Sequence, residues 1–432
     1  MANPDLIVVG AGAAGLAAAA ACGEHGQHVL MVEARDRVGG RIHTLHYPDF
    51  PLPIELGAEF VHGRPEETVA LIERGGLAEY DVADRHLRRT DRGLDEATDF
   101  WDEISRVLDR LDPHAADTSF AEFLLHRAGD SGLAEGRRLA ARYIEGFHAA
   151  DLGRISARAV AEAERGSASG GSDASRILNG YAAVVGELHH DAVRTGAEVR
   201  LGHEVTAVRW RRGSVRVTTR DADGTTAEWT APRAILTLPL PLLQEAAGAG
   251  GGLSIEPFPA GWTEPLGGLR MGHVVRTVIR FRSRFWPRHA SFVHHPDSVR
   301  WQLWWTPAPI DAPVLTGWCG GPPAERLAQL APDAIAEHAV TDLAHLFGQS
   351  PDRVAELVVG ADTHDWTADR FSRGAYSYVV AGASGAADAL AEPVEATLVV
   401  AGEAAAPSGR HGTVDGAIAS GRRAAARLLG GI

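Results

Sequence analysis

Three glycines that follow directly on an apolar run near the start of the chain restrict its possible folds more than any other feature. Residues 6–9 read Leu-Ile-Val-Val, which predicts a buried strand, and Gly10, Gly12 and Gly15 come next in the spacing Gly-x-Gly-x-x-Gly. An alanine-rich stretch over 13–22 predicts a helix, and residues 28–33 predict a second strand. Because strands joined by a helix run parallel, we expect the chain to open with a βαβ unit of a parallel sheet.

The same junction is suited to binding a dinucleotide. In this spacing the first glycine makes a tight turn, the second lets the backbone approach a pyrophosphate, and the third packs the helix on the strand. The N-terminus of the helix supplies N–H donors and partial positive charge to the phosphates. Glu33 ends the second predicted strand, where its carboxylate accepts both ribose hydroxyls of an adenosine and disfavours a 2′-phosphate.

A second glycine pair extends this motif. Residues 33–41 read EARDRVGGR, so Gly39 and Gly40 precede Arg41. A longer cofactor needs a second close approach of the backbone and a guanidinium to clamp its pyrophosphate, which favours FAD over NAD. An ordinary solvated arginine is the alternative for Arg41.

Composition excludes several classes of partner and site. The formal net charge of −14 argues against nucleic acid and against anionic membrane surfaces, and it is mildly favourable to cationic amines. Cys22 and Cys319 are too far apart in sequence for a disulfide framework or a zinc motif, and no histidine pair has metal-ligand spacing, so no metal is predicted. With no signal-peptide pattern and no apolar run of about 20 residues, we expect a soluble, cytoplasmic protein.

The order of the predicted elements indicates an α/β protein. Residues 66–168 are mostly helical in period, strands alternate over 198–239, further strands follow at 273–284 and 299–317, and a helix is predicted over 333–347. A strand over 396–401 and a helix over 414–429 close the chain, and small-residue joints lie at 167–175 and 246–252. We therefore predict a two-lobed, Rossmann-like FAD-binding domain of the GR2 type over 1–75, 176–245 and 390–432. An α+β substrate-binding domain over 76–175 and 246–389 is inserted into it.

Five ordered motifs resemble those of the flavin amine oxidase family, which includes monoamine oxidases, polyamine oxidases, L-amino-acid oxidases and flavin-type histone demethylases. They are EARDRVGGR (33–41), ELGAEFVHG (55–63), RMGHVVRTVIRF (270–281), DWTADRFSRGAYSYV (365–379) and VVAGEAAAPSGRHGTVDGAIASGRRAA (399–425). The segments GAEFVHG and GTVDGA are more similar to polyamine oxidases than to monoamine oxidases. The match extends over almost the whole chain.

The resemblance implies which residues bind FAD. Gly57, Ala58 and Glu59 would lie along the flavin ring, and the backbone of Val205 would pair with adenine. Residues 237–239 would line the cofactor channel, and the N-terminus of the last helix would point at the flavin, where negative charge appears on reduction. The full predicted set is Gly10, Gly12, Ala14, Gly15, Glu33, Ala34, Arg35, Gly40, Arg41, Gly57, Ala58, Glu59, Val205, Gly402, Glu403, Thr413 and Val414.

Four residues are implied to face the substrate or the reacting flavin edge: Arg276, Tyr376, His62 and Trp366. Tyr376 matches an aromatic wall that orients the amine and excludes water, and Trp366 matches an aromatic residue beside the ring. His62 matches a histidine near the substrate of polyamine oxidases. Core packing is the alternative for the two aromatic residues, and hydrogen bonding to the backbone is the alternative for His62.

This chain departs from the family pattern at three positions. Ala375 stands where monoamine oxidases carry the cysteine that links flavin, so we expect non-covalent FAD. Thr413 replaces the second aromatic wall. Arg276 replaces the lysine that reaches flavin N5 through a water, and it keeps the positive charge. Arg276 either aids oxygen reduction, indicates a dehydrogenase, binds a substrate carboxylate, or is a salt-bridged strand residue.

The expected reaction is hydride transfer from the α-carbon of a neutral primary or secondary amine, polyamine or amino acid to flavin N5. Imine hydrolysis follows, with O2 as the expected acceptor. A C–C desaturase or isomerase on the same scaffold, an amine dehydrogenase with another acceptor, and a non-catalytic FAD-binding protein remain as alternatives. Trp301, Trp304, Trp305 and Trp318 are interpreted either as cavity lining or, more usually, as sheet core. The sequence does not determine the oligomeric state.

Overall fold

The computed structural model of the chain describes residues 3–166, 173–248, 252–296 and 298–430. Its first layer is a five-stranded sheet in the order β10-β2-β1-β14-β23, in which every neighbouring pair is parallel. The strands are β1 (Leu6–Val9), β2 (Val29–Val32), β10 (Glu198–Arg200), β14 (Arg233–Leu236) and β23 (Leu398–Val400). The predicted parallel sheet is therefore present, and its strands come from three stretches far apart in the sequence.

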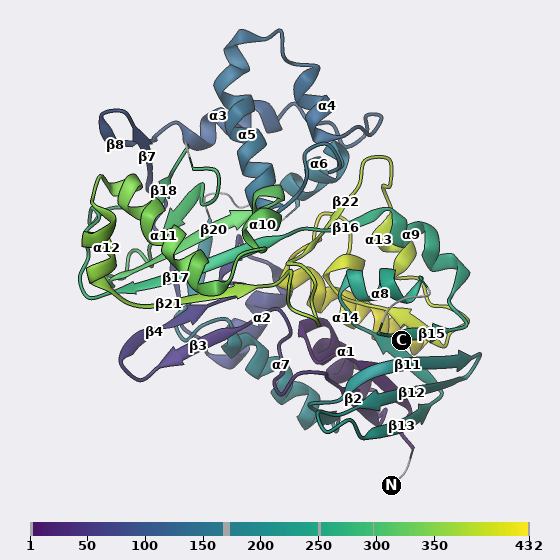
Figure 1. Ribbon diagram of the computed structural model, residues 1–432. Helices are drawn as coiled ribbons and strands as arrows, with labels where there is room; N and C mark the ends of the chain where they lie inside the picture. Colours follow the sequence, from purple (N-terminus) through teal and green to yellow (C-terminus); the bar gives the residue numbers. More distant parts are fainter. Residues whose placement is uncertain (1–2, 167–172, 249–251, 297, 431–432) are drawn as a thin grey trace.

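Helices from several parts of the chain share a hydrophobic core with this sheet: α1 (Ala13–Glu24), α2 (Glu66–Gly75), α7 (Ala182–Arg194) and α14 (Val414–Leu428). Helix α1 packs against α7 and α14, and Figure 1 shows the purple α1 beside the yellow α14. A Cβ on Gly421 would lie 2.1 Å from the carbonyl oxygen of Ala14. Small residues on α1 and α14 therefore let the two ends of the chain pack closely.

An antiparallel sheet beside the parallel one has the order β13-β12-β11-β15. Its strands are β11 (Glu204–Arg211), β12 (Ser214–Arg220), β13 (Thr226–Ala231) and β15 (Ser254–Glu256). The predicted turn between β11 and β12 is present, with Gly213 at φ 73°. Strand β15 lies beyond the expected domain boundary at 245, yet it pairs with β11 because Ile255 joins the core of the first lobe. Residues 249–251 of the predicted joint at 246–252 lie outside the described residues.

Short elements beyond residue 239 continue this core. They are α8 (Leu240–Ala246), η2 (Ala260–Trp262), α9 (Thr263–Gly267), β16 (Leu269–Met271), β22 (Ser377–Val379), α13 (Ala386–Leu390) and η3 (Glu403–Ala405). Trp262, Leu266 and Leu269 are buried in the same cluster as strand residues of the parallel sheet. Residues 254–271 therefore pack with the cofactor-motif lobe, whereas the division into two domains stays a prediction.

A seven-stranded sheet forms the second body, in the order β21-β17-β20-β19-β18-β7-β8. The strands are β7 (His86–Thr90), β8 (Gly93–Glu96), β17 (Val274–Phe281), β18 (Phe292–His294), β19 (Leu303–Trp305), β20 (Val314–Gly320) and β21 (Val358–Asp365). Three helices pack on it: α10 (Pro322–Leu327), α11 (Pro332–Phe347) and α12 (Pro351–Leu357). Strands β7 and β8 fall within the stretch 66–168 that was expected to be mostly helical.

The remaining elements connect the two bodies. A helical group contains α3 (Phe100–Leu108), α4 (Phe120–Leu125), η1 (Ser131–Leu133), α5 (Ala134–Phe147) and α6 (Ala157–Arg165). Two small sheets contain β3 (Thr44–Tyr47) with β4 (Phe50–Glu55), and β5 (Phe60–His62) with β9 (Ala174–Ile177) and β6 (Glu79–Asp81). Most of the predicted joint at 167–175 lies outside the described residues. Within the described part of the chain, no helix has the length and apolar character needed to cross a membrane.

Candidate functional site

A cavity of about 620 Å³ lies between the two bodies of the molecule. The parallel sheet contributes the ends of β1, β2 and β14, the last helix contributes its first turn, and the inserted region contributes α5, α6, β18 and β19. All of the predicted cofactor and substrate residues line this cavity except Gly15. The structure therefore brings together motifs that are separated by nearly the whole chain.

The glycine turn has the geometry that a close-approaching cofactor needs. Gly10 has φ +102°, and a Cβ there would lie 2.5 Å from the Thr237 hydroxyl oxygen. A Cβ on Gly15 would lie 2.0 Å from the Gly10 carbonyl oxygen, which explains why Gly15 packs helix on strand and does not face the cavity. At Gly12 a Cβ would meet nothing within 4 Å, so this position is open toward the cavity. The turn and the N-terminus of α1 fit the pyrophosphate of a dinucleotide.

Glu33 holds the ends of the first two strands in register. Its buried carboxylate accepts the backbone N–H of Ala11 at 2.8 Å and that of Arg35 at 2.9 Å. The Arg35 guanidinium donates to both carboxylate oxygens of Asp369, at 3.0 and 2.7 Å. Burial alone would raise the pKa of Asp369, but hydrogen bonds from His364 and Arg35 hold it well below its ordinary value. This ion pair links the first cofactor motif to the segment that carries Trp366.

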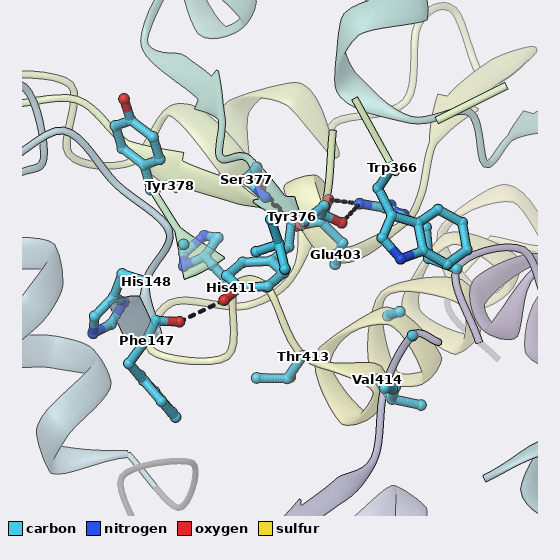
Figure 2. Close-up of a pocket in the computed structure, with 18 of the residues that line it drawn as sticks. Phe147, His148, Trp366, Tyr376, Ser377, Tyr378, Glu403, His411, Thr413 and Val414 are labelled. Carbon is cyan, nitrogen blue, oxygen red and sulfur yellow. Dashed lines mark hydrogen bonds and ion pairs between the residues drawn. The ribbon is translucent and has the colours of Figure 1, made fainter. Parts of the chain in front are cut away.

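A second buried network surrounds Glu403. Arg41 donates to Glu403 at 2.8 Å and to the carbonyl of Ala375 at 2.7 Å, and the hydroxyl of Ser377 donates to Glu403 at 2.7 Å. Burial opposes ionisation, but the charge of Arg41 and these hydrogen bonds hold the pKa of Glu403 below its ordinary value. Arg41 therefore joins the 33–41 and 399–425 motifs while it also lines the cavity. Figure 2 shows Ser377 and Glu403 close together.

Glu59 binds two arginines. Its carboxylate accepts Arg176 Nε at 2.5 Å, Arg276 Nη2, and the indole N–H of Trp305 at 3.1 Å. Arg276 also donates to the Gly57 carbonyl at 2.8 Å and is only 2% exposed. Of the four interpretations given for Arg276, this geometry supports a salt-bridged strand residue. The Arg276 side chain also borders the cavity. The Glu59 carboxylate therefore accepts hydrogen bonds from Arg176, Arg276 and Trp305.

Tyr376 is positioned by backbone contacts on both sides. Gly272 N–H donates to the Tyr376 carbonyl at 2.7 Å, and Ala375 N–H donates to the Gly272 carbonyl at 2.8 Å. The Tyr376 hydroxyl donates to the Phe147 carbonyl at 2.6 Å, a contact drawn in Figure 2. Burial raises the pKa of Tyr376 above its ordinary value, so the phenol remains neutral. A Cβ on Gly412 would lie 3.1 Å from the Tyr376 ring, so this glycine leaves room for the ring.

The residue at the expected second aromatic wall caps a helix instead. Thr413 Oγ1 accepts the N–H of Gly416 at 2.9 Å and donates to the carbonyl of Arg410 at 2.8 Å. Helix α14 therefore begins at Val414, as predicted, and its first turn faces the cavity. Phe147 and Tyr143, stacked at 5.1 Å between ring centroids, supply aromatic surface from α5 that the sequence did not indicate.

The other predicted aromatic residues divide between cavity and core. Trp366 is 3% exposed and donates its indole N–H to the Leu56 carbonyl at 2.8 Å, and it borders the cavity. The His62 ring lies edge-on to Phe147 at 5.4 Å. Of the four clustered tryptophans, Trp305 and Trp318 line the cavity, whereas Trp301 and Trp304 are fully buried in the core of the seven-stranded sheet. The cavity-lining interpretation is therefore confirmed for Trp305 and Trp318, and the sheet-core interpretation is confirmed for Trp301 and Trp304.

The cavity is also lined by residues that were not identified from the sequence. Arg88, Arg138, Arg142 and Arg300 line it together with His86 and His294. The nitrogen atoms of His86 and His294 are 2.8 Å apart, and His86 is also 2.7 Å from Asp84. Burial lowers the pKa of His294 well below its ordinary value. These residues come from β7, α5, β18 and the segment before β19. They share no sequence motif, so no pattern in the sequence predicts that they lie together.

Neither cysteine borders the cavity. Cys22 lies in α1 and Cys319 in β20, and burial raises the pKa of each thiol to about 12. Among the residues that the structure describes, no three His, Cys, Asp or Glu side chains are grouped to hold a metal ion.

Comparison with known proteins finds relatives that extend over nearly the whole chain. Residues 13–429 match the family described as flavin containing amine oxidoreductase. Polyamine oxidase 2 of Arabidopsis thaliana is 27% identical over 98% of this chain and 87% of its own length. Lysine-specific histone demethylase 2 of Homo sapiens is 26% identical over 99% of this chain, which spans 53% of the human protein.

Solved structures share the fold. A wild-type putrescine oxidase bound to putrescine aligns with a TM-score of 0.81 at 21% identity, covering 99% of both chains. Cyclohexylamine oxidase from Brevibacterium oxydans IH-35A aligns with a TM-score of 0.77 at 21% identity, again over 99% of both chains. The mixed α/β arrangement of sheets and helices is common to all three structures.

Proposed function

Because this chain belongs to the flavin-containing amine oxidoreductase family, and is thus an FAD-dependent oxidoreductase, we propose that it oxidises a C–N bond of a small amine. The observation that carries this proposal is the single cavity lined both by the dinucleotide turn and by Tyr376. Polyamine oxidases and putrescine oxidase among the similar proteins support an amine as substrate.

In this proposal FAD is bound non-covalently by both ends of the chain. The open backbone at Gly12 and the N-terminus of α1 hold the pyrophosphate, and Glu33 receives the adenosine ribose. The start of α14 at Val414 and the backbone of Gly57 hold the ring. Bound FAD supplies a two-electron acceptor whose N5 takes a hydride. Ala375 next to Tyr376 and the remote, buried thiols support a non-covalent cofactor.

The residues around Tyr376 orient the amine and exclude water. Tyr376, Phe147 and Tyr143 offer aromatic faces that receive the substrate carbon chain and the neutral amine. His411 lines the same space, and burial lowers its pKa, so it adds no charge there near neutral pH. Aromatic faces that exclude water favour the neutral amine, the form that can release a hydride from its α-carbon. The imine product hydrolyses once it reaches water.

Two arginines against one carboxylate give the cluster around Glu59 a net positive charge. Arg276 and Arg176 both contact Glu59, and the nearby acid Glu55 has its pKa raised to about 7 by burial. Below that pH Glu55 is mostly protonated and does not cancel the excess charge. We propose that this charge stabilises the negative charge that develops on reduction and favours O2 as the final acceptor, giving hydrogen peroxide.

Anaerobic mixing of the purified holoprotein with amines tests the proposal. We expect loss of the oxidised flavin absorbance with at least one class of amine, and its return with stoichiometric peroxide when air is admitted. A matched series of primary, secondary and tertiary amines identifies the class.

Three other results would each support a different function. Bleaching that persists in air but is reversed by an artificial electron acceptor would identify a dehydrogenase. Bleaching by an unsaturated or saturated hydrocarbon substrate, but by no amine, would identify a desaturase or isomerase. Flavin that no amine or hydrocarbon bleaches would leave only a cofactor-binding role and overturn the proposal.

A further inference from the structure

Aromatic side chains from five separate elements form part of the cavity wall, and they contact one another in a closed series. Strand β5 and helix α5 each contribute two of them, and β7, β18 and α3 contribute one each. All of them line the cavity. We refer to this group as the aromatic collar, which consists of Phe60, His62, His86, Trp101, Tyr143, Phe147 and Phe292.

The first half of the series is centred on α5. The Phe147 and Tyr143 rings are stacked, with 5.1 Å between their centroids, and Phe147 also meets the His62 ring edge-on at 5.4 Å. On the other side, Tyr143 meets the Trp101 indole edge-on at 5.6 Å. Two residues one helical turn apart therefore connect β5 to α3.

The second half of the series returns through the seven-stranded sheet. Trp101 meets the His86 ring edge-on at 5.6 Å, and His86 stacks on Phe292 at 5.0 Å. Phe292 contacts Phe60 at 6.4 Å, and Phe60 contacts His62 at 5.7 Å, where the series began. Each ring therefore has a neighbour in the collar on both sides.

The collar is distinct from the buried core. Each collar residue keeps some exposed surface, 37% in the case of Phe147, whereas Trp301 and Trp304 of the adjoining sheet are fully buried. Because the collar residues also line the cavity, part of their exposed surface faces its interior. The collar therefore offers ring surface to a molecule that occupies the cavity.

Tyr376 places the collar next to the site of the proposed oxidation. Its hydroxyl donates to the Phe147 carbonyl at 2.6 Å, as Figure 2 shows. Phe147 is the last residue of α5 and carries one of the collar rings. A molecule whose amine lies against Tyr376 therefore has its remaining atoms within reach of the collar.

We propose that the aromatic collar binds an aryl group of the substrate, so that the substrate class is an arylalkylamine. This inference rests on the proposed function, because that function places the amine beside Tyr376. An aryl ring within the collar buries its apolar surface and meets further rings edge-on or in offset stacks, which are favourable arrangements. The collar residues thus determine specificity for the group at the far end of the amine.

A second ammonium group is a poorer occupant of the same space. Asp84 lies 2.7 Å from His86, Glu164 lies 3.4 Å from the Tyr143 hydroxyl, and Arg88 also lines the cavity, so charges of both signs lie near the collar. The phenyl, phenol and indole faces themselves carry no charge. An ammonium group among them loses hydration, and cation–π attraction returns only part of that loss. We therefore expect diamines such as putrescine, the ligand of one similar structure, to be poor substrates here.

A matched amine series tests the inference with the holoprotein. Phenylalkylamines with one to four methylene groups first identify the best chain length. At that length, four amines that end in phenyl, cyclohexyl, methyl or ammonium differ only in the far group. The second-order rate constant for anaerobic flavin reduction should be at least about tenfold higher for the phenyl than for the methyl compound, and about threefold higher than for the cyclohexyl compound. The diamine should be the slowest.

Substitutions in the collar give a second readout. Phe292→Leu and Trp101→Leu should each lower the phenyl-over-methyl ratio of rate constants about fivefold, because leucine keeps apolar volume but removes the ring. Trp101→Phe keeps an aromatic ring and should retain most of the ratio. Phe258→Leu is the matched control and should keep the wild-type ratio, because Phe258 is partly exposed, meets Trp262 edge-on and does not line the cavity.

Binding without chemistry gives a third readout. The phenylalkanol of the best chain length has no amine to oxidise, and it should perturb the bound flavin spectrum with a lower Kd than the matching cyclohexylalkanol. That Kd should rise in Phe292→Leu and Trp101→Leu and stay unchanged in Phe258→Leu. Full flavin content and a wild-type unfolding midpoint show that each variant is folded.

The outcomes separate the inference from the proposed function. Flavin reduction that is equally fast with the phenyl and cyclohexyl compounds, or fastest with the methyl compound or the diamine, overturns the inference and leaves amine oxidation intact. A phenyl preference that both leucine variants retain also overturns it. Flavin that no amine reduces argues against the proposed function. In that case phenylalkanol binding that the leucine variants lose still supports an aryl site, and equal binding by all variants overturns it.

Discussion

Two buried glutamates four residues apart have pKa values that are shifted in opposite directions because their partners differ. Burial would raise the pKa of Glu59, but Arg276 and Arg176 hold it below its ordinary value. Glu55 accepts the Tyr181 N–H at 2.6 Å and the Thr44 hydroxyl at 2.7 Å and contacts no arginine of the described ranges, so burial raises its pKa to about 7. The pKa values of Glu55 and Glu59 depend on which side chains contact each carboxylate in the folded chain. The motif ELGAEF alone does not predict those contacts.

Glu55 gives a pH-dependent prediction. The folded state keeps a proton on Glu55 between its unfolded pKa near 4.5 and its folded pKa near 7, so stability contributed by this group is lost as pH rises through that window. Glu55→Gln removes the penalty. Between about pH 5 and pH 8.5, the free energy of unfolding of the variant should therefore rise relative to wild type by on the order of 3 kcal/mol. Urea unfolding at both pH values measures this.

The control for that experiment is Glu24→Gln, at an exposed position near the end of α1. It should leave the pH dependence of unfolding as in wild type. Parallel pH curves for Glu55→Gln and wild type would show that Glu55 ionises normally.

Two glycines of the dinucleotide turn should respond differently to alanine. At Gly15 the new Cβ would meet the Gly10 carbonyl oxygen at 2.0 Å, so Gly15→Ala should destabilise the fold by more than about 2 kcal/mol, although alanine normally favours a helix. At Gly12 the Cβ meets no protein atom within 4 Å. Gly12→Ala should therefore fold with nearly wild-type stability and bind FAD at least tenfold more weakly, as calorimetric titration of the apoprotein would show. Equal FAD affinity in Gly12→Ala and wild type would contradict the assigned pyrophosphate site.

At the scale of elements, sequence patterns located strands and helices where apolar residues repeat regularly. The expected helix at 414–429 corresponds to α14, and the expected strand at 273–284 contains β17. Strand β7, with the sequence HLRRT, was missed because Leu87 is its one fully buried residue. Its pairing with β18, more than 200 residues later, holds it in the sheet, and no local pattern reports such a partner.

The cap of α14 provides a prediction at this scale. Thr413→Val removes the hydroxyl that accepts the Gly416 N–H, which should cost about 1 kcal/mol of stability, whereas Thr413→Ser keeps that acceptor and should match wild type. Since the same helix start is proposed to face the flavin, Thr413→Val should also weaken FAD binding. Chemical denaturation and FAD titration of the two variants measure both effects. Indistinguishable valine and serine variants would mean that the cap contributes nothing.

At the scale of the whole molecule, the cofactor motifs predicted that both ends of the chain would meet, and α1 packs against α14 as that requires. The cavity residues Arg88, Arg142 and Arg300 were not predicted, because they come from β7, α5 and the segment before β19, which only the folded chain brings together. The pairing of β15 with β11, across the predicted boundary at 245, is likewise a contact that no local pattern reports, and the boundary itself stays a prediction.

Binding of FAD should raise the midpoint temperature of thermal unfolding. If FAD binds only the folded chain, free FAD at about 100 times its Kd should stabilise the protein by about 2.7 kcal/mol and raise the unfolding midpoint as its concentration increases. Gly12→Ala should show a smaller rise at the same concentration. A midpoint that does not depend on FAD would contradict a site built from both ends of the fold.

The meeting of α1 with α14 also has a consequence for biosynthesis. A ribosome delivers Gly12 roughly 400 residues before Val414, so the nascent chain carries half of a nucleotide site throughout most of its elongation. Until β23 emerges, the outer edge of β14 has no parallel neighbour. Chains terminated before residue 398 are therefore expected to lack the yellow colour of flavin, which an absorbance spectrum of the purified product would test.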